Sequence, residues 1–251
     1  MENRIQYIFG IHPVLEAVRT GKEIDKIYFK KGLEGPGFRE LLEEAHKKGI
    51  VSQFVPVEKL NKLAKGGSHQ GVAACLATIE YSDLEESVNR ACALGDSPVF
   101  VLLDGVSDVR NLGAIARSVE CAGANGIIVP AKGGAAINAE AVKASAGALL
   151  RIDTCRVANL RLAIFYLQQN GFKIVAATEK SSTPIYDVDM TGPVAIIMGS
   201  EQKGVSPSVL GLADETACIP MAGEISSLNV SAAASVVLFE MVRQRYNNKT
   251  L

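Results

Sequence analysis

The sequence lacks the features that mark several large classes of protein. It contains no Trp, and aromatic residues make up only 6% of its 251 residues. No apolar run reaches the roughly 18 residues that a membrane-spanning helix requires. The five cysteines are scattered without a Cys-x-x-Cys pair, which argues against a disulfide framework and a zinc site. The N-terminal residues include no apolar signal-peptide core, so we expect a reduced, cytoplasmic protein that binds no metal.

An excess of charge of either sign is also missing. The chain has 26 basic and 27 acidic residues, a formal net charge of −1, and 48% hydrophobic residues. This balance excludes a largely disordered chain. Residues 1–81 hold 12 Lys and Arg against 10 Asp and Glu, and the remainder holds 14 against 17. That difference is too small to identify a nucleic-acid surface by itself.

The first 80 residues predict a small α/β domain. Alternating apolar and polar residues indicate strands, and apolar residues at helical spacing indicate helices. We expect strands at 24–30, 51–55 and 72–79 and helices at 38–48 and 57–63. Residues 81–98 are mostly polar and end in turn residues, so they are the expected interdomain linker, with room for one helix.

Residues 99–251 predict a doubly wound α/β domain. Short, nearly continuous apolar runs suit parallel strands that are buried on both faces, and amphipathic stretches separate them. We expect strands at 99–103, 126–129, 173–177 and 194–198, and helices at 112–122, 139–149, 160–169 and 230–245. Ligands of such a domain bind at the carboxyl ends of the strands.

The loop after the first strand of this domain carries the first candidate site. Residues 104–117 read DGVSDVRNLGAIAR, in which Asn111 and Gly113 open a helix and Arg117 follows six residues after Asn111. Free N–H groups at a helix start bind anions. A helix cap beside a solvated Arg would explain the same residues.

The second loop, residues 198–206 (MGSEQKGVS), resembles a nucleotide phosphate loop only in part. Gly199 and Gly204 have the interval of that motif, but Val205 stands where the motif requires Lys. The Gly-x-Gly-x-x-Gly signature is missing from every predicted strand-to-helix turn, which argues against an NAD- or nucleotide-dependent enzyme. What remains is a tight turn that carries one carboxylate, Glu201.

The third loop, residues 219–231 (IPMAGEISSLNVS), leads into the last predicted helix. It concentrates short hydrogen-bonding side chains at Ser226, Ser227, Asn229 and Ser231. Capping of the helix explains one or two of them, so the surplus predicts a ligand site rich in backbone contacts.

In this order and spacing, the three loops resemble the motifs of the SpoU (TrmH) family of RNA ribose 2′-O-methyltransferases. The matching residues are Asn111-x-Gly113-x-x-x-Arg117, Met198-Gly199-x-Glu201-x-x-Gly204, Ile219-Pro220-Met221 and 227–231 (SLNVS). Residues 9–17 (FGIHPVLEA) and His69-Gln70-Gly71 are similar to the RlmB-like subgroup. That subgroup methylates a guanosine ribose in the 23S rRNA loop that receives the P-site tRNA end.

The resemblance implies a fold and a cofactor. Residues 1–80 would form an L30e-like RNA substrate-binding domain, and residues 99–251 a SPOUT-type catalytic domain with a trefoil knot, an exception to the rule against threaded chains. The methyl donor would be S-adenosylmethionine. The matching positions imply that it contacts Thr178, Gly199, Ile219, Met221 and Leu228. A homodimer formed through the last helix and the first-motif region is also implied.

The resemblance further implies five catalytic residues, which are Asn111, Arg117, Glu201, Ser227 and Asn229. The residue matching Arg117 has been proposed as the base in the family, but a guanidinium is normally always protonated. We therefore expect Arg117 to hold a phosphate and to stabilise developing alkoxide charge. Glu201 would orient Arg117 or bind RNA, while Ser227 and Asn229 would fix Arg117 and the donor loop. A side chain in place of Gly199 would crowd the donor.

RNA contact needs only a local basic face on a neutral molecule. The candidates in the N-terminal domain are Lys30, Lys31, Arg39, Lys62, Lys65, His69 and Gln70. Two alternatives stay open: the same chemistry on tRNA or another rRNA nucleotide, and a non-catalytic L30e-like RNA-binding protein.

Overall fold

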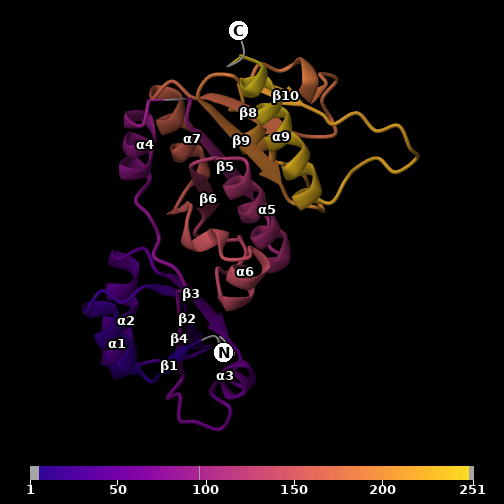
Figure 1. Cartoon of the computed structure of the whole chain (residues 1–251). Coiled ribbons are helices and arrows are strands. Elements are labelled where there is room, and N and C mark those ends of the chain that lie inside the picture. Colours follow the sequence, from indigo (N-terminus) through magenta and orange to yellow (C-terminus); the bar gives the residue numbers. More distant parts are fainter. Residues whose placement is uncertain (1–5, 96, 249–251) are drawn as a thin grey trace. The chain divides into compact units, whose positions relative to one another are not determined.

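A computed structural model describes residues 6–95 and 97–248 of the chain. The chain divides into two compact units (Figure 1). The first unit holds the chain up to Glu80 together with Ile137–Ala139, and the second holds the rest. Within the described residues, no helix is both long and apolar enough to cross a membrane.

The first unit is a four-stranded sheet with helices on both faces. The strands are β1 (Tyr7–Phe9), β2 (Ile24–Lys30), β3 (Val51–Val55) and β4 (Val72–Leu76), in the order β1-β4-β2-β3. The helices are α1 (Ile11–Arg19), α2 (Pro36–Lys47) and α3 (Val57–Ala64). Strand β4 is antiparallel to β1 and β2, whereas β3 is parallel to β2.

Alternation along β2 explains how this sheet is covered. Ile27 and Phe29 point to one face and pack with buried residues of α1 and α2, such as Leu41. Tyr28 points to the other face, where Leu60 of α3 covers it. The period-2 pattern of a strand therefore produces two apolar layers from a single sheet.

The second unit is built on a six-stranded parallel sheet, which confirms the predicted α/β class. The strands are β5 (Val99–Asp104), β6 (Gly126–Pro130), β7 (Asp153–Val157), β8 (Lys173–Ala177), β9 (Val194–Gly199) and β10 (Glu215–Ala217), in the order β10-β8-β9-β5-β6-β7. All neighbouring pairs are parallel. Strand β9 is buried at every position, as expected for a strand inside a sheet that is covered on both faces.

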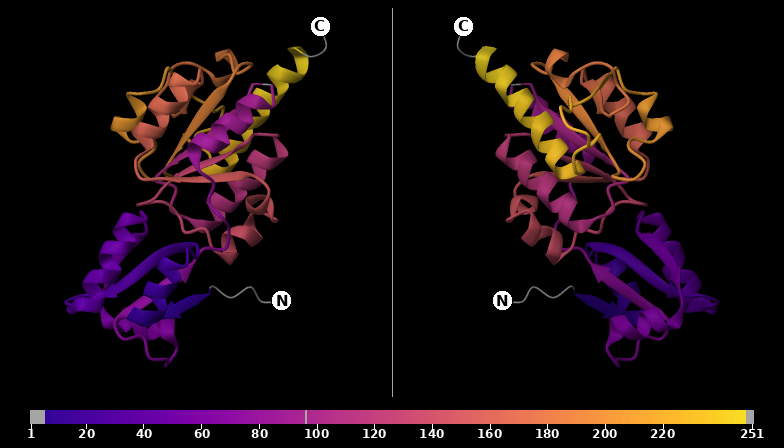
Figure 2. Two further views of the ribbon diagram at one scale, coloured as in Figure 1. Left: turned by 90° about the vertical axis from the view of Figure 1, so that its left-hand side faces the viewer. Right: turned by 90° about the vertical axis from the view of Figure 1, so that its right-hand side faces the viewer.

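Helices cover both faces of this second sheet (Figure 2). They are α4 (Leu84–Ala93), α5 (Val109–Cys121), α6 (Ala139–Ala144), α7 (Leu160–Gln169), α8 (Pro207–Leu210) and α9 (Val230–Asn248), with 3-10 turns at Ala148–Leu150 and Ile185–Asp187. Residues of α4, α7 and α8 share one buried cluster with the sheet. Helices α5 and α9 pack against each other, and a 2.8 Å hydrogen bond joins the hydroxyls of Ser118 and Ser235.

The segment expected as a linker with room for one helix, residues 81–98, contains α4 and belongs to the second unit. Asp83 caps α4 by accepting a hydrogen bond from the backbone N–H of Glu86 (3.0 Å). Val88 and Ala91 of α4 are buried in the core of that unit. The polar composition of the segment reflects the solvent face of an amphipathic helix, so the buried apolar side chains went unrecognised.

Smaller differences concern short elements. The predicted helix at 139–149 ends at Ala144 and resumes only as a 3-10 turn. Strands β1, β7 and β10 are absent from the sequence-based prediction. Two of them, β1 and β10, have only three residues each, too few to show a period of two.

Candidate functional site

The three predicted motifs meet at one edge of the second sheet. Asp104 of β5 pairs with Gly199 of β9, and Met198 pairs with Ala177 of β8. These strands are parallel and neighbouring, so the loops that follow them leave the sheet side by side. Asp104 also accepts a hydrogen bond from the backbone N–H of Ser206 (2.7 Å), which ties the loop after β9 to the end of β5.

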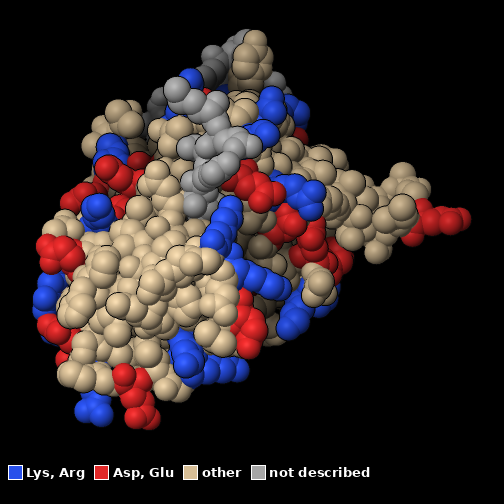
Figure 3. Space-filling view, turned by 90° about the horizontal axis from the view of Figure 1, so that it is seen from below, with Lys and Arg blue, Asp and Glu red and all other residues tan. Residues whose placement is uncertain are grey.

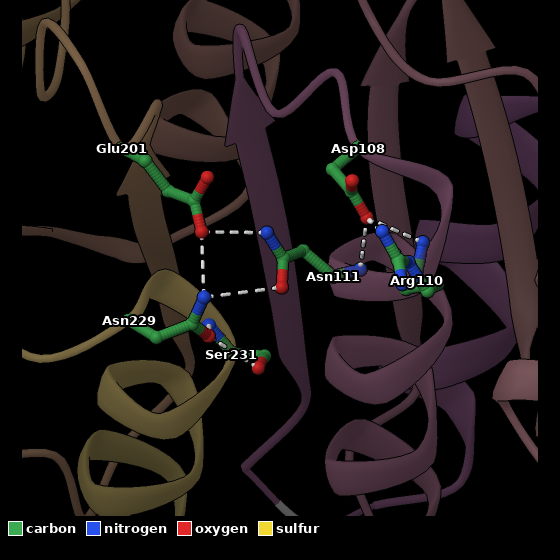
Figure 4. Close-up of polar contacts among 6 residues, drawn as sticks. All are labelled: Asp108, Arg110, Asn111, Glu201, Asn229 and Ser231. Carbon is green, nitrogen blue, oxygen red and sulfur yellow. Dashed lines mark hydrogen bonds and ion pairs between the residues drawn. The ribbon is translucent and has the colours of Figure 1, made fainter.

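A cluster of three side chains joins the three motifs (Figure 4). Oε1 of Glu201 accepts hydrogen bonds from Nδ2 of Asn111 and from Nδ2 of Asn229, both at 2.6 Å. Nδ2 of Asn229 also donates to Oδ1 of Asn111 (3.2 Å). One carboxylate oxygen and two amides thus hold the start of α5, the loop after β9 and the start of α9 together.

Asn229 also caps helix α9. Its Oδ1 accepts hydrogen bonds from the backbone N–H (2.9 Å) and the hydroxyl (2.6 Å) of Ser231. Capping therefore uses the carbonyl end of this side chain, while the amino end serves the cluster.

The start of helix α5 is a capped helix end, which is the second of the two interpretations given for this loop. Oδ1 of Asp108 accepts hydrogen bonds from the backbone N–H groups of Arg110 (2.8 Å) and Asn111 (3.1 Å). Both bonds lower the pKa of the Asp108 carboxyl below its ordinary value, and the bond from Asn111 has the larger effect. The carboxylate of Asp108 already supplies a negative charge at this helix start. A second anion would therefore gain little free energy by binding there.

A cavity of about 370 Å³ lies beside the cluster, and we call it the first cavity. All five residues predicted to contact the donor line it, as do Glu201 and Ser227. Its wall combines apolar side chains such as Met198 with charged ones such as Glu179 and Lys180. The structure therefore brings together Thr178, Gly199, Ile219, Met221 and Leu228, which come from three separate segments of the chain.

Gly199 is required for a reason that differs from the prediction. A Cβ atom at this position would lie 2.2 Å from the backbone carbon of Gly204 and 2.2 Å from the backbone nitrogen of Val205. The turn between them is closed by backbone hydrogen bonds between Ser200 and Gly204 (3.1 and 2.8 Å). A side chain at Gly199 would thus collide with the protein's own turn before it crowded a ligand.

A second cavity of about 310 Å³ is also lined by residues of this turn. Asp108 and Asn111 line it but do not line the first cavity. The two cavities share five lining residues, namely Ser200, Glu201, Gln202, Lys203 and Val230. Glu201 therefore borders both cavities.

Arg117 stands apart from this cluster. Its side chain is exposed on α5, lines neither cavity, and makes no hydrogen bond or ion pair to any residue in the described ranges. Six residues along a helix turn the side chain well away from that of Asn111. Glu201 thus contacts the two asparagines rather than Arg117. Ser227 lines the first cavity but is not bonded to Arg117 among the described residues.

The predicted RNA contacts gather near one end of the first sheet. Strand β2 ends at Lys30, whose backbone N–H bonds to the carbonyl of Gly71 (2.8 Å), and the next residue, Lys31, bonds to the carbonyl of Val55 (2.9 Å). Lys62 and Lys65 lie at the end of α3, and Arg39 lies in the first turn of α2. All five cationic side chains are exposed.

His69 and Gln70 form a tight turn at the same end. Nε2 of His69 lies 2.9 Å from Oδ1 of Asn61, and Nδ1 accepts the N–H of Gly71 (3.0 Å). One ring nitrogen is thus engaged with helix α3 and the other with the turn itself. Gln70 is exposed with a φ of 48°.

Charge on one face of the molecule is mixed rather than segregated. In the face shown in Figure 3, Lys and Arg side chains alternate with Asp and Glu around a broad area that carries no charge. A basic surface for RNA would therefore consist of a few local cations.

Sequence reasoning missed several residues of the site. Ser200, Gln202 and Lys203 line both cavities, yet none of them was singled out. Their position inside the second motif was an available signal. The described residues contain no group of three or more His, Cys, Asp or Glu side chains that could hold a metal ion.

Comparisons with known proteins agree with this architecture. Residues 98–239 match the model of the SpoU rRNA Methylase family, and residues 7–82 match the model described as RNA 2′-O ribose methyltransferase substrate binding. A protein of Staphylococcus haemolyticus, whose name places it in the TrmH family of tRNA/rRNA methyltransferases, is 35% identical over 239 residues. That alignment covers 95% of this chain and 96% of the relative.

Two solved structures show the same likeness. The SpoU methyltransferase AviRb from Streptomyces viridochromogenes, in complex with AdoMet, is 26% identical with a TM-score of 0.62 and covers 96% of this chain and 90% of its own. The TrmH/SpoU tRNA modifying enzyme of A. aeolicus is 30% identical with a TM-score of 0.56 and covers 66% of this chain and 86% of its own. With both family models matched in order and the motif residues clustered at one edge of the sheet, the chain belongs to the SpoU (TrmH) family of RNA 2′-O-ribose methyltransferases.

Proposed function

We propose that the protein transfers a methyl group from S-adenosylmethionine to the ribose 2′-hydroxyl of a guanosine in 23S rRNA, as in the RlmB-like subgroup. The observation that carries the proposed site is the Asn111–Glu201–Asn229 cluster, which stands between two cavities. A transfer reaction needs a donor site and an acceptor site that share a border. The two cavities adjoin each other because five residues line both of them.

The first cavity suits the donor. Its volume of about 370 Å³ falls in the range of small-molecule sites. Apolar side chains such as Met198 suit the adenine ring, and Glu179 and Lys180 supply the charges that complement an ammonium and a carboxylate. When bound, S-adenosylmethionine supplies an electrophilic methyl group. Thr178, Gly199, Ile219, Met221 and Leu228 would hold it.

Asn111 and Arg117, two of the predicted catalytic residues, would act on the RNA side. Asn111 lines the second cavity, and Asn229 fixes its orientation. Arg117 is exposed and free to bind an RNA phosphate, which agrees with a role in holding the substrate. Ser227 lines the donor cavity and would shape the donor loop.

The first unit would bind the RNA substrate. Its exposed cations at the end of the first sheet, Lys30, Lys31, Arg39, Lys62 and Lys65, would contact phosphates, with Gln70 beside them. Binding should then weaken as salt rises, by about 0.7 in log K per log salt for each phosphate contact to single-stranded RNA. Salt-independent binding would contradict this part of the proposal.

Two further family features are part of the proposal. A homodimer would form through the paired helices α5 and α9, where Phe239 remains 49% exposed. The segment that links β10 to α9 would take part in a trefoil knot. The domain division at about residue 80 is likewise proposed as a functional division between RNA binding and methyl transfer.

A second candidate substrate is tRNA, because the likeness to the A. aeolicus tRNA modifying enzyme covers 66% of this chain. Labelled S-adenosylmethionine incubated with 23S rRNA and, separately, with tRNA would decide between them. We expect label in 23S rRNA at one guanosine ribose. Label in tRNA alone would show that tRNA, rather than 23S rRNA, is the substrate. No label in either RNA would overturn the proposed function.

A further inference from the structure

Glu201 occupies a position that no other acidic residue in the described part of the chain shares. It is the one carboxylate that lines both cavities, since Glu179 lines only the first and Asp108 only the second. A group that removes a proton from the acceptor must lie where donor and acceptor meet. Among the described acidic residues, Glu201 alone satisfies this geometric condition.

The two carboxylate oxygens of Glu201 differ in their hydrogen bonds. Oε1 accepts both asparagine amides at 2.6 Å. Oε2 accepts no hydrogen bond from any described residue, and Figure 4 shows it pointing away from the amides. The carboxylate is therefore held in a fixed orientation by one oxygen while the other retains its lone pairs.

The asparagines hold the carboxylate in place through one oxygen only. Each amide donates to Oε1 through Nδ2, so neither bond uses Oε2. In contrast, Arg117 lines neither cavity, and a guanidinium stays protonated in proteins. The residue expected as a base in the family is thus poorly placed in this chain, and Glu201 is well placed.

From these observations we infer that Oε2 of Glu201 is the proton acceptor of the methyl transfer and that the second cavity holds the target ribose. This inference rests on the proposed function. The 2′-hydroxyl proton moves to Oε2 as the 2′-oxygen forms its bond to the methyl carbon. The bond from that carbon to sulfur breaks, and its electron pair stays on the sulfur, which becomes a neutral thioether. The proton on Glu201 then passes to water, and the carboxylate is restored.

The test compares Glu201→Gln with the parent. Glutamine keeps the size of the side chain and an oxygen that accepts the two amides, but it cannot take the proton. We expect the rate of methyl transfer at saturating RNA and donor to fall by roughly a hundredfold or more. The dissociation constants for S-adenosylmethionine alone and for RNA alone, measured without turnover, should stay within about twofold.

A matched control uses a glutamate outside the site. Glu224 is exposed and lines neither cavity, so Glu224→Gln should retain the parent rate.

The outcomes separate the two proposals. If the parent methylates RNA and Glu201→Gln does so within threefold of its rate, the inference is wrong while the proposed function stands. A loss of donor or RNA binding in Glu201→Gln would assign the residue a positioning role and also overturn the inference. A parent without activity on any RNA would overturn the proposed function itself.

Discussion

The amide nitrogen of Asn229 lies 2.6 Å from Oε1 of Glu201, although the two residues are 28 positions apart. The same side chain caps α9 through its carbonyl oxygen. One asparagine thus couples the start of the last helix to the carboxylate between the cavities, and the two roles can be separated by substitution.

Asn229→Ser should keep the cap and lose the cluster. A serine hydroxyl accepts the N–H bond at a helix start, but it is too short to reach both Glu201 and Asn111. We expect thermal stability close to that of the parent and a loss of methyl transfer. Asn229→Ala should lose both, with a further decrease in stability of about 1 kcal/mol. Equal activity in the serine variant and the parent would show that the cluster is dispensable.

Gly199→Ala should destabilise the protein rather than only weaken donor binding. The new Cβ would lie 2.2 Å from backbone atoms of Gly204 and Val205, so the turn must move. We expect a decrease of about 2 kcal/mol in the free energy of unfolding, measured by denaturant titration. Gly192→Ala is the control, since nothing lies within 4 Å of its Cβ position. A fully stable Gly199→Ala variant with weak donor affinity would favour the ligand-crowding explanation instead.

Arg245 should contribute to stability through three carbonyl groups. Its guanidinium donates to the carbonyls of Ser97 (2.6 Å), Gly192 (2.7 Å) and Met190 (3.0 Å). Burial lowers the pKa of Arg245 from its ordinary high value, and an arginine still keeps its proton at neutral pH.

Arg245→Ala would leave those carbonyls without their partner, so we expect a decrease of about 2 kcal/mol in the free energy of unfolding. The control is Arg161→Ala on the exposed surface of α7, which should change stability by less than about 0.5 kcal/mol. Similar unfolding curves for the two variants would show that the hydrogen bonds of Arg245 add no measurable stability.

The cysteines should differ in their reactivity toward thiol reagents. Cys92 and Cys121 are exposed, whereas Cys75 and Cys155 are buried. Burial raises the pKa of both buried thiols to about 11. At pH 8 a thiol reagent should therefore label Cys92 and Cys121 quickly and should reach Cys75 and Cys155 only after unfolding. Fast labelling of all four, read by mass spectrometry, would contradict the packing described.

The same pKa shifts predict a decline in stability in alkaline solution. A thiol whose folded pKa lies above its unfolded value of about 8.5 holds its proton more tightly in the folded state. Its contribution is complete below about pH 8.5 and is lost as the pH rises toward 11. Replacing Cys75 or Cys155 by Ala should flatten this part of the stability profile.

Local sequence patterns predicted much of the fold because they report local physics. The strands at 24–30, 51–55 and 173–177 and the helix at 160–169 agree with β2, β3, β8 and α7. Each has a clear period or a continuous apolar run, which fixes the element before any tertiary contact forms. Helix α4 was harder to recognise because only one face of it is apolar.

The sequence by itself determined that the first two loops would leave one edge of a parallel sheet, since parallel strands place their carboxyl ends together. Resemblance to family motifs also predicted five of the residues that line the first cavity. Only the tertiary structure decided which side chains bond to one another. Asn111 meets Glu201 across 90 positions and Asn229 across 118, while Arg117, on the same helix as Asn111, turns away. Spacing along the chain specifies the strand end from which a loop departs, but hydrogen bonds between loops depend on the final positions of atoms to within a few tenths of an ångström.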